Sequence, residues 1–380
     1  MANWKYVKIG DVCTVERGGS PRPIDKFITD DPNGINWIKI GDTDDSMYIT
    51  KTAQKIIPEG MKKSRYVQPG DFLLSNSMSF GRPYILKIDG CIHDGWLVLR
   101  DNNGIFDKRF LYYYLSAPST YQKFKNMAVG GVVNNLNSEM VRGVTVPVPT
   151  MEEQLNIVVT LDKVTELIAL RKEQLAKLDR LVKSRFIELF GDPKTNNKEW
   201  RMNTFADICT VRQGLQIPIS KRLTQYEEGC YEYITVAYLH GSKEQEYIKN
   251  PKSTVICTEE DVLMTRTGNT GMVITNVAGA FHNNFFLIDF DRTRYNKVFL
   301  VEYLNLDLIQ AEIKRRAGTS TIPDLNHGEF YAISIYEPPV ELQKQFAAFV
   351  EQTDKSKMAI QQSLDKLELL KKSLMQEYFG

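Results

Sequence analysis

The stretch KSRFIELFGDPK, residues 183–194, lies near the middle of this 380-residue chain, and the chain ends on a similar stretch, KKSLMQEYFG, residues 371–380. When the sequence is compared with itself at an offset of 189 residues, the Phe-Gly pairs of both stretches coincide. The match extends back without a gap to Phe110, which falls on Phe299. The similar endings are therefore one element used twice.

The front of each half repeats as well. WKYVKIGDVCTVERG from Trp4 and WRMNTFADICTVRQG from Trp200 share Trp, Asp, Cys-Thr-Val and Gly at an offset of 196, and GDFLLSNSMSFG from Gly70 matches EDVLMTRTGNTG from Glu260 at an offset of 190. Small changes of offset indicate insertions or deletions in loops, which tolerate them. The chain is a tandem duplication.

Each half begins with short alternating or apolar runs, such as INWIKI and YILKI, which predict strands. Glycine and proline then disappear for about 40 residues, which predicts a helix of ~60 Å. We therefore expect a strand-rich domain over residues 1–150, a long helix over 151–191, a second strand-rich domain over 192–339 and a second long helix over 340–380.

Each predicted long helix has an apolar stripe with a spacing of three and four residues. The stripes contain Leu161, Ile168, Leu175 and Leu178 in the first helix and Ile360, Leu364, Leu367 and Leu374 in the second. A stripe can pack on its own domain or on the other helix, and two matched stripes in one chain favour an antiparallel coiled coil. The polar run EQTDKSKM, residues 351–358, leaves the register of pairing open. The predicted fold class is α+β, with a pseudo-twofold internal repeat.

Composition excludes few functions. The 48 basic and 47 acidic residues give a net charge of +1, so a surface that binds a polyanion would have to be local. The five cysteines are scattered, which favours reduced thiols in the cytoplasm. The sequence has no run of about 18–20 apolar residues, so we expect a cytoplasmic protein and no membrane partner.

The sequence also contains no recognisable catalytic motif. It has no phosphate-binding G-x-x-x-x-G-K-[ST] loop, no G-x-S-x-G nucleophile motif and no H-E-x-x-H or Cys/His cluster for a metal. The run EPPV, residues 337–340, lacks the amide or acid and the aromatic residue of a methyltransferase N-P-P-Y motif. We therefore predict a non-catalytic protein that holds neither a metal nor a cofactor.

Two strand-rich units each end in proline and a glutamate-glutamine helix start, PTMEEQLNI and PPVELQKQF, and the helices close on FIELFGDP and LMQEYFG. This layout resembles the specificity subunit of type I restriction-modification systems. The front motifs VCTVERGGSPRP and ICTVRQG are similar to the target-recognition domains of that family.

This resemblance implies that each recognition domain reads one half of a split double-stranded DNA target and that the paired helices set the gap. It also implies that two methyltransferase subunits dock on the two long helices, for which the eight stripe residues named above are the candidate positions. Restriction subunits would join the complex, and S-adenosylmethionine would bind the partners instead of this chain.

Polar loop residues that repeat in place but differ in identity are the candidates for DNA contact, because two readers of different sequences need different side chains. The candidates are Ser77, Ser79, Arg82 and Asn134 in the first half, Arg266, Asn269, Thr270, Thr319 and Ser320 in the second, and more weakly Arg22 and Gln213. Each of them is equally explained as the solvated tip of a turn.

Two other functions compete with this prediction. One is a coiled-coil scaffold with two sugar- or protein-binding heads, and the other is a self-contained DNA methyltransferase, for which the motifs are missing. Salt-sensitive, sequence-selective DNA binding without a bound methyl donor would separate the three.

Overall fold

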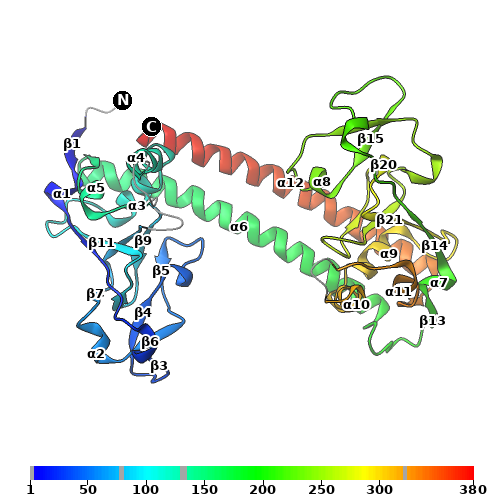
Figure 1. The fold of residues 1–380 in the computed structure, drawn as a ribbon, viewed down its shortest axis with the longest axis horizontal. Helices are drawn as coiled ribbons and strands as arrows, with labels where there is room; N and C mark the ends of the chain where they lie inside the picture. The colour runs from blue at the N-terminus through cyan, green and yellow to red at the C-terminus, as the bar shows by residue number, and fades with distance from the viewer. Residues whose placement is uncertain (1–3, 77–80, 129–134, 320–322) are drawn as a thin grey trace. The chain divides into compact units, whose positions relative to one another are not determined.

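The computed structural model describes residues 4–76, 81–128, 135–319 and 323–380. The chain divides into two compact units, which we describe separately. Unit 1 comprises residues 1–172 and 362–380, and unit 2 comprises residues 173–361. Both long helices contribute to both units (Figure 1).

Unit 1 contains a two-stranded sheet and two five-stranded sheets. The strand orders are β1-β12, β3-β6-β4-β10-β7 and β2-β11-β8-β9-β5. The strands are β1 Lys5–Lys8, β2 Thr14–Arg17, β3 Ile28–Thr29, β4 Ile35–Ile38, β5 Tyr48–Ile49, β6 Gln54–Ile56, β7 Arg65–Val67, β8 Phe72–Ser75, β9 Pro83–Leu86, β10 Gly90–Ile92, β11 Trp96–Arg100 and β12 Thr145–Val148.

Unit 2 repeats this arrangement with four strands in each larger sheet. Its orders are β13-β22, β14-β21-β18-β19 and β16-β15-β20-β17. The strands are β13 Arg201–Thr204, β14 Cys209–Gln213, β15 Cys230–Ile234, β16 Glu246–Lys249, β17 Ile256–Cys257, β18 Val262–Thr265, β19 Val273–Ile274, β20 Gly279–Phe281, β21 Phe285–Phe290 and β22 Ser334–Glu337. The shared core of both units is the run β2-β11-β8-β9, which corresponds to β14-β21-β18-β19.

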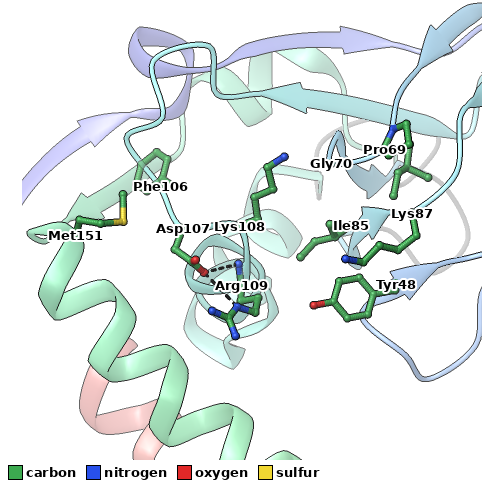
Figure 2. A pocket seen from close by; sticks show the side chains of 11 residues that line it. Tyr48, Pro69, Gly70, Ile85, Lys87, Phe106, Asp107, Lys108, Arg109 and Met151 are labelled. Carbon is green, nitrogen blue, oxygen red and sulfur yellow. Dashed lines mark hydrogen bonds and ion pairs between the residues drawn. The ribbon is translucent and has the colours of Figure 1, made fainter.

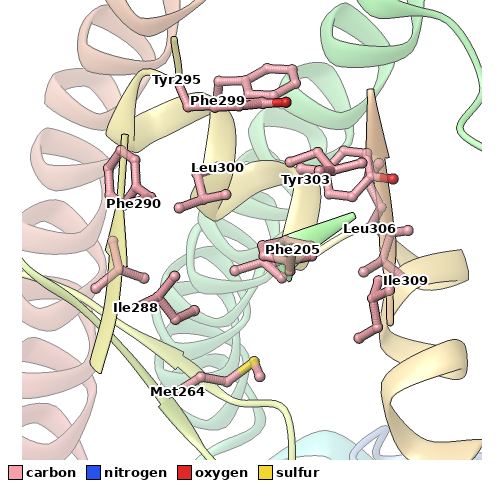
Figure 3. Packing of buried hydrophobic residues seen from close by; sticks show 14 of the residues in the cluster. Phe205, Met264, Ile288, Phe290, Tyr295, Phe299, Leu300, Tyr303, Leu306 and Ile309 are labelled. Atoms are coloured by element: carbon pink, nitrogen blue, oxygen red, sulfur yellow. The ribbon is translucent and has the colours of Figure 1, made fainter. Parts of the chain in front are cut away.

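Among the described residues, each unit has two short α-helices near its start, α1 Ile9–Val12 and α2 Pro58–Met61 in unit 1 and α7 Phe205–Ile208 and α8 Val236–Leu239 in unit 2. Three more lie between β11 or β21 and the long helix. They are α3 Lys108–Ser116, α4 Pro118–Ala128 and α5 Ser138–Arg142 in unit 1, and α9 Lys297–Leu304, α10 Asp307–Ala317 and α11 His327–Tyr331 in unit 2. Figure 3 shows part of the unit 2 core, where aromatic side chains of α9, such as Phe299 and Tyr303, lie among residues of β18 and β21. Burial of these large apolar surfaces stabilises the packing of helix on sheet.

The long helices are α6, Met151–Phe190, and α12, Val340–Phe379. In unit 1, Leu161 near the start of α6 packs in one cluster with Phe379 at the end of α12, and Lys172 pairs with Glu368 at 3.1 Å. The two helices therefore run antiparallel within unit 1.

The two helices also run antiparallel within unit 2, where the end of α6 packs against the start of α12. The ring of Phe186, near the end of α6, lies 5.4 Å from that of Phe346, near the start of α12, and Lys357 pairs with Asp179 at 2.8 Å. The predicted α+β class, with strand-rich units and long antiparallel helices, is confirmed.

The eight stripe residues named from the sequence differ in how far they are buried. Leu161, Ile168 and Leu364 are buried, and the remaining five are half-buried: Leu175, Leu178, Ile360, Leu367 and Leu374. Leu161 and Leu374 pack in the hydrophobic core of unit 1. The five half-buried residues keep part of their surface exposed.

A buried glutamine fastens each long helix to its domain. The Gln154 side chain accepts a hydrogen bond from the Asp107 backbone N–H at 2.8 Å and donates to the carbonyl oxygens of Ile105 and Pro149 at 2.9 and 3.1 Å. This one amide joins the start of α6 to the start of α3 and to the end of β12.

Gln343 makes the same three contacts in unit 2. It accepts from the Asn296 N–H at 2.8 Å and donates to the carbonyl oxygens of Arg294 and Pro338 at 2.9 and 2.8 Å. The partners are offset by the same 189 residues as the glutamines, so the repeated Glu-x-Gln pattern in the sequence has a structural reason.

Replacing Gln343 by leucine should leave three buried backbone groups without partners, and we expect a loss of about 2–4 kcal/mol in the free energy of unfolding. Gln154→Leu should have a similar effect in unit 1. Urea unfolding of the full chain, followed by circular dichroism, measures the change. Gln352→Leu at an exposed position of α12 is the control, and we expect a change within about 0.5 kcal/mol. Equal effects of Gln343→Leu and Gln352→Leu would contradict this role.

Candidate nucleic-acid interface

The predicted DNA-contact residues of each unit come mainly from two loops, residues 75–82 and 129–137 in unit 1 and 265–271 and 318–326 in unit 2. In each unit the described parts of the two loops are hydrogen-bonded to each other. In unit 1, the Leu136 N–H before α5 donates to the Asn76 carbonyl after β8 at 3.0 Å. In unit 2, the Leu325 N–H before α11 donates to the Arg266 carbonyl after β18 at 2.9 Å. Sequence reasoning selected both loops separately, and the structure brings them together by the same bond in both units.

The turn that follows β2 in unit 1 and β14 in unit 2 is hydrogen-bonded to the strand next to these loops. In unit 1, the Gly18 N–H donates to the Trp96 carbonyl at 2.9 Å, and in unit 2 the Gly214 N–H donates to the Phe285 carbonyl at 3.2 Å. These glycines correspond in the repeat. A Cβ on Gly18 would lie 2.1 Å from the His93 carbonyl oxygen, so only glycine allows this approach.

A fourth segment lies between the loops and was missed by sequence reasoning. It is His93–Asp94–Gly95 in unit 1 and His282–Asn283–Asn284 in unit 2. The Asn76 N–H donates to the Gly95 carbonyl at 2.9 Å, and the Arg266 N–H donates to the Asn284 carbonyl at 2.7 Å. The one signal in the sequence was that the two histidines occupy matching places.

Both histidines hold the backbone of this segment. Nδ1 of His93 accepts a hydrogen bond from the Gly95 N–H at 2.6 Å, and Nδ1 of His282 accepts from the Asn284 N–H at 3.1 Å. Burial lowers the pKa of both imidazoles, which favours their neutral forms. Their role in the described structure is to shape the turn.

We call the four segments together the loop surface of each unit. Its described residues are 17–22, 75–76, 81–82, 93–95 and 135–137 in unit 1, and 213–218, 265–271, 282–284, 318–319 and 323–326 in unit 2. The framework of hydrogen bonds is shared, whereas several side chains on it differ. Arg17, Asn76 and Asp94 correspond to Gln213, Arg266 and Asn283.

Several predicted site residues are exposed on the loop surface. The Arg22 side chain is 83% exposed and lies 3.7 Å from the Asp94 carboxylate. Arg82 lies 3.6 Å from Asp45 and against the Tyr84 ring. Gln213, Asn269 and Thr319 are also exposed.

Two predicted residues of unit 2 hold the loop instead of facing outward. Arg266 is only 18% exposed and makes a two-pronged ion pair with Asp324, with nitrogen–oxygen distances of 3.0 and 2.7 Å. The Thr270 hydroxyl is buried within reach of the Arg266 and Pro323 carbonyl oxygens, both at 3.1 Å. These contacts assign Arg266 and Thr270 to the framework of the loop surface.

The remaining candidates, Ser77, Ser79, Asn134 and Ser320, lie outside the described residues. Among the described residues, no group of three or more His, Cys, Asp or Glu side chains is placed to hold a metal ion. Over the same residues, no helix combines the length and the apolar character that crossing a bilayer requires.

A second basic region of unit 1 lies apart from these segments, at the starts of α3 and α6. Figure 2 shows Lys87, Lys108 and Arg109 around a pocket that Tyr48 and Met151 also line. Arg109 is engaged by Asp162 at 2.7 Å, and the Lys87 ammonium lies 4.4 Å from the centre of the Tyr48 ring. We assign no ligand to this pocket.

The repeat and its two loop surfaces agree with a known family. The family model of the type I restriction modification DNA specificity domain matches residues 1–180 and 197–369. The chain belongs to this family. The two matched segments contain most of each unit, so the duplication seen in the sequence is a duplication of the specificity domain.

Individual relatives are distant. The MjaIX specificity subunit of a type I restriction enzyme from Methanocaldococcus jannaschii is 24% identical over 257 residues, which is 62% of this chain and 58% of that protein. The match therefore spans less than two thirds of that relative.

Solved structures support the fold over the full length. A structure concerning complex assembly and conformational transition of the type I R-M system contains a chain with 18% identity and a TM-score of 0.61, covering 100% of this chain and 98% of that one. The type I S subunit from M. genitalium gives 15% identity and a TM-score of 0.58, with 100% and 96% covered.

Alanine at Gly18 or Gly214 should disrupt the loop surface, because the new Cβ would lie 2.1 or 2.2 Å from the carbonyl oxygen of His93 or His282. We expect each variant to lose at least about 2 kcal/mol of stability in urea unfolding. Gly41→Ala is the matched control, since a Cβ there would meet no described atom within 4 Å. Unchanged stability of both test variants would show that the turn does not pack as described.

Proposed function

We propose that this chain is the DNA-specificity subunit of a type I restriction-modification complex, and that each loop surface reads one half of a split double-stranded DNA target. The observation that carries the proposal is a framework of hydrogen bonds shared by both units, with different polar side chains on it. Arg17 and Gln213 illustrate this, because they correspond in the repeat, are both exposed, and precede the glycines whose N–H groups make corresponding hydrogen bonds. Two readers of different base sequences require this combination.

The proposal makes the chain non-catalytic. Methyl transfer, with S-adenosylmethionine, belongs to two methyltransferase subunits, and cleavage belongs to restriction subunits that join them. The domains would then be residues 1–150 and 192–339 as readers, with residues 151–191 and 340–380 as the helices that set the gap. A role on cellular DNA fits the cytoplasmic location expected from the sequence.

We propose that the methyltransferase subunits dock on exposed apolar residues of the helices. Leu181 on α6 and Leu370 on α12 correspond in the repeat and are 48% and 45% exposed. Exposed leucines at matched positions would give two similar contacts for two copies of one partner. The buried stripe around Leu161 would hold the helices together beneath them.

Co-expression with the methyltransferase encoded beside this chain should produce host DNA methylated at a split motif with a fixed gap. Single-molecule mapping of methylated bases measures it. Exchange of residues 1–150 for another recognition domain should alter one half of the motif and leave the other half unchanged. An assembled complex that methylates no motif would contradict the proposed function.

The double variant Leu181→Glu, Leu370→Glu should reduce the methyltransferase recovered with this chain by at least about tenfold, because two charges would have to be buried at the contacts. Affinity purification followed by mass photometry counts the subunits. Met358→Glu is the control, because Met358 is 64% exposed on α12 but corresponds to an alanine in α6. Normal recovery with the double variant would place the docking site elsewhere.

A further inference from the structure

Arg22 stands out among the described side chains of the loop surface of unit 1 because it is a largely free cation beside a fixed anion. Its guanidinium lies 3.7 Å from the Asp94 carboxylate, a distance that permits attraction but is too long for a hydrogen bond. The flanking residues Pro21 and Pro23 restrict the backbone on both sides. The N–H donors of the Arg22 guanidinium are therefore oriented by Asp94 but remain available to another acceptor.

Asp94 is itself held firmly. Its Oδ1 accepts a hydrogen bond from the Ser20 hydroxyl at 2.7 Å, and its carbonyl oxygen accepts from Asn76 Nδ2 at 2.9 Å and from Arg17 Nε at 3.1 Å. The Ser20 hydrogen bond lowers the pKa of the Asp94 carboxyl, so this group is ionised at neutral pH. Asp94 therefore connects three segments of the loop surface and presents a negative charge to Arg22.

Unit 2 carries different residues at these places. Pro218 and Asn283 correspond to Arg22 and Asp94, and neither has a charge. The nearby guanidinium of Arg266 is already occupied by a bidentate ion pair with Asp324. The arrangement of an exposed arginine against a fixed carboxylate is therefore specific to unit 1 among these corresponding positions.

An arginine backed by a carboxylate is better suited to a base edge than to a phosphate. The adjacent negative charge of Asp94 repels the phosphate backbone, whereas the O6 and N7 acceptors of guanine are uncharged and match the planar guanidinium. The carboxylate also restrains the side chain, which reduces the entropy lost when it binds.

Resting on the proposed function, we infer that Arg22 reads a guanine in the half-target of unit 1 and that Asp94 is the positioning residue that aims its guanidinium. Asp94 acts through Arg22 and does not itself contact the guanine. The ligand chemistry is the major-groove edge of a G·C pair in double-stranded DNA.

The test compares the methylated motifs of four complexes, each made from the full chain and its methyltransferase: unchanged, Arg22→Ala, Asp94→Asn and the double variant. We expect Arg22→Ala to relax a single G·C position in one half of the motif, with preference for that pair reduced about 10- to 100-fold. Asp94→Asn should relax the same position to a smaller degree, and the double variant should match Arg22→Ala, because the carboxylate works only through the arginine.

Two controls show whether a changed motif results from loss of the Arg22 contact itself. Arg201→Ala removes an exposed arginine from β13, outside both loop surfaces, and should leave the motif unchanged. Thermal unfolding of each variant separates a lost contact from a lost fold. Asp94→Asn keeps an oxygen for the Ser20 hydroxyl and should unfold like the unchanged chain.

Three results would overturn the inference. Uniformly weaker methylation with every base preference intact would identify Arg22 as a phosphate contact. No change with Arg22→Ala would place it outside the DNA interface. Additive losses in the double variant would show that Asp94 does not act through Arg22. Absence of any split motif with the unchanged chain is a separate result, and it would refute the proposed function itself.

Discussion

The buried amides of Gln154 and Gln343 are the contacts on which the rest of each unit depends. Each joins the start of a long helix to the end of the last strand and to the residue before a short helix. Each bonded carbonyl and N–H would otherwise be a buried polar group without a partner, which is costly. A glutamine suits this position because its amide both donates and accepts. The direction of the long helix relative to its domain follows from these bonds.

The loop surfaces show how one framework can carry two specificities. The backbone hydrogen bonds that join the loops recur in both units, and so do the glycines that allow the close approach at His93 and His282. Side chains that face outward differ between the units. Specificity can then change without loss of the fold, because the backbone hydrogen bonds that join the loops are the same whichever side chain stands at a varying position.

Charged side chains in this protein are balanced locally, by partners of opposite charge in the same unit. Many guanidinium groups are occupied by carboxylates of their own unit, as Arg294 is by Glu337, and this pair lowers the Glu337 pKa to about 2. A near-neutral chain can still bind DNA if a few cations stay exposed at the right place. Arg22 and Arg266 show the two extremes of exposure. The Arg22 side chain is mostly exposed, whereas the Arg266 side chain is mostly buried and paired with Asp324.

The sequence by itself determined the duplication, the two long helices, the strand-rich domains and the family resemblance. These features leave periodic or repeated patterns, which can be read without coordinates. It also selected three of the four segments of the loop surface, because they repeat in place and differ in identity.

Only the tertiary structure decided what those loops do with one another. It showed that Thr270 and Arg266 are held inside the framework, that the two helices run antiparallel within each unit, and that Asp94 lies beside Arg22. Each of these contacts joins residues far apart in the chain or depends on which face a side chain occupies. Such contacts have no period and no motif, so they become visible only when the strands between them have folded.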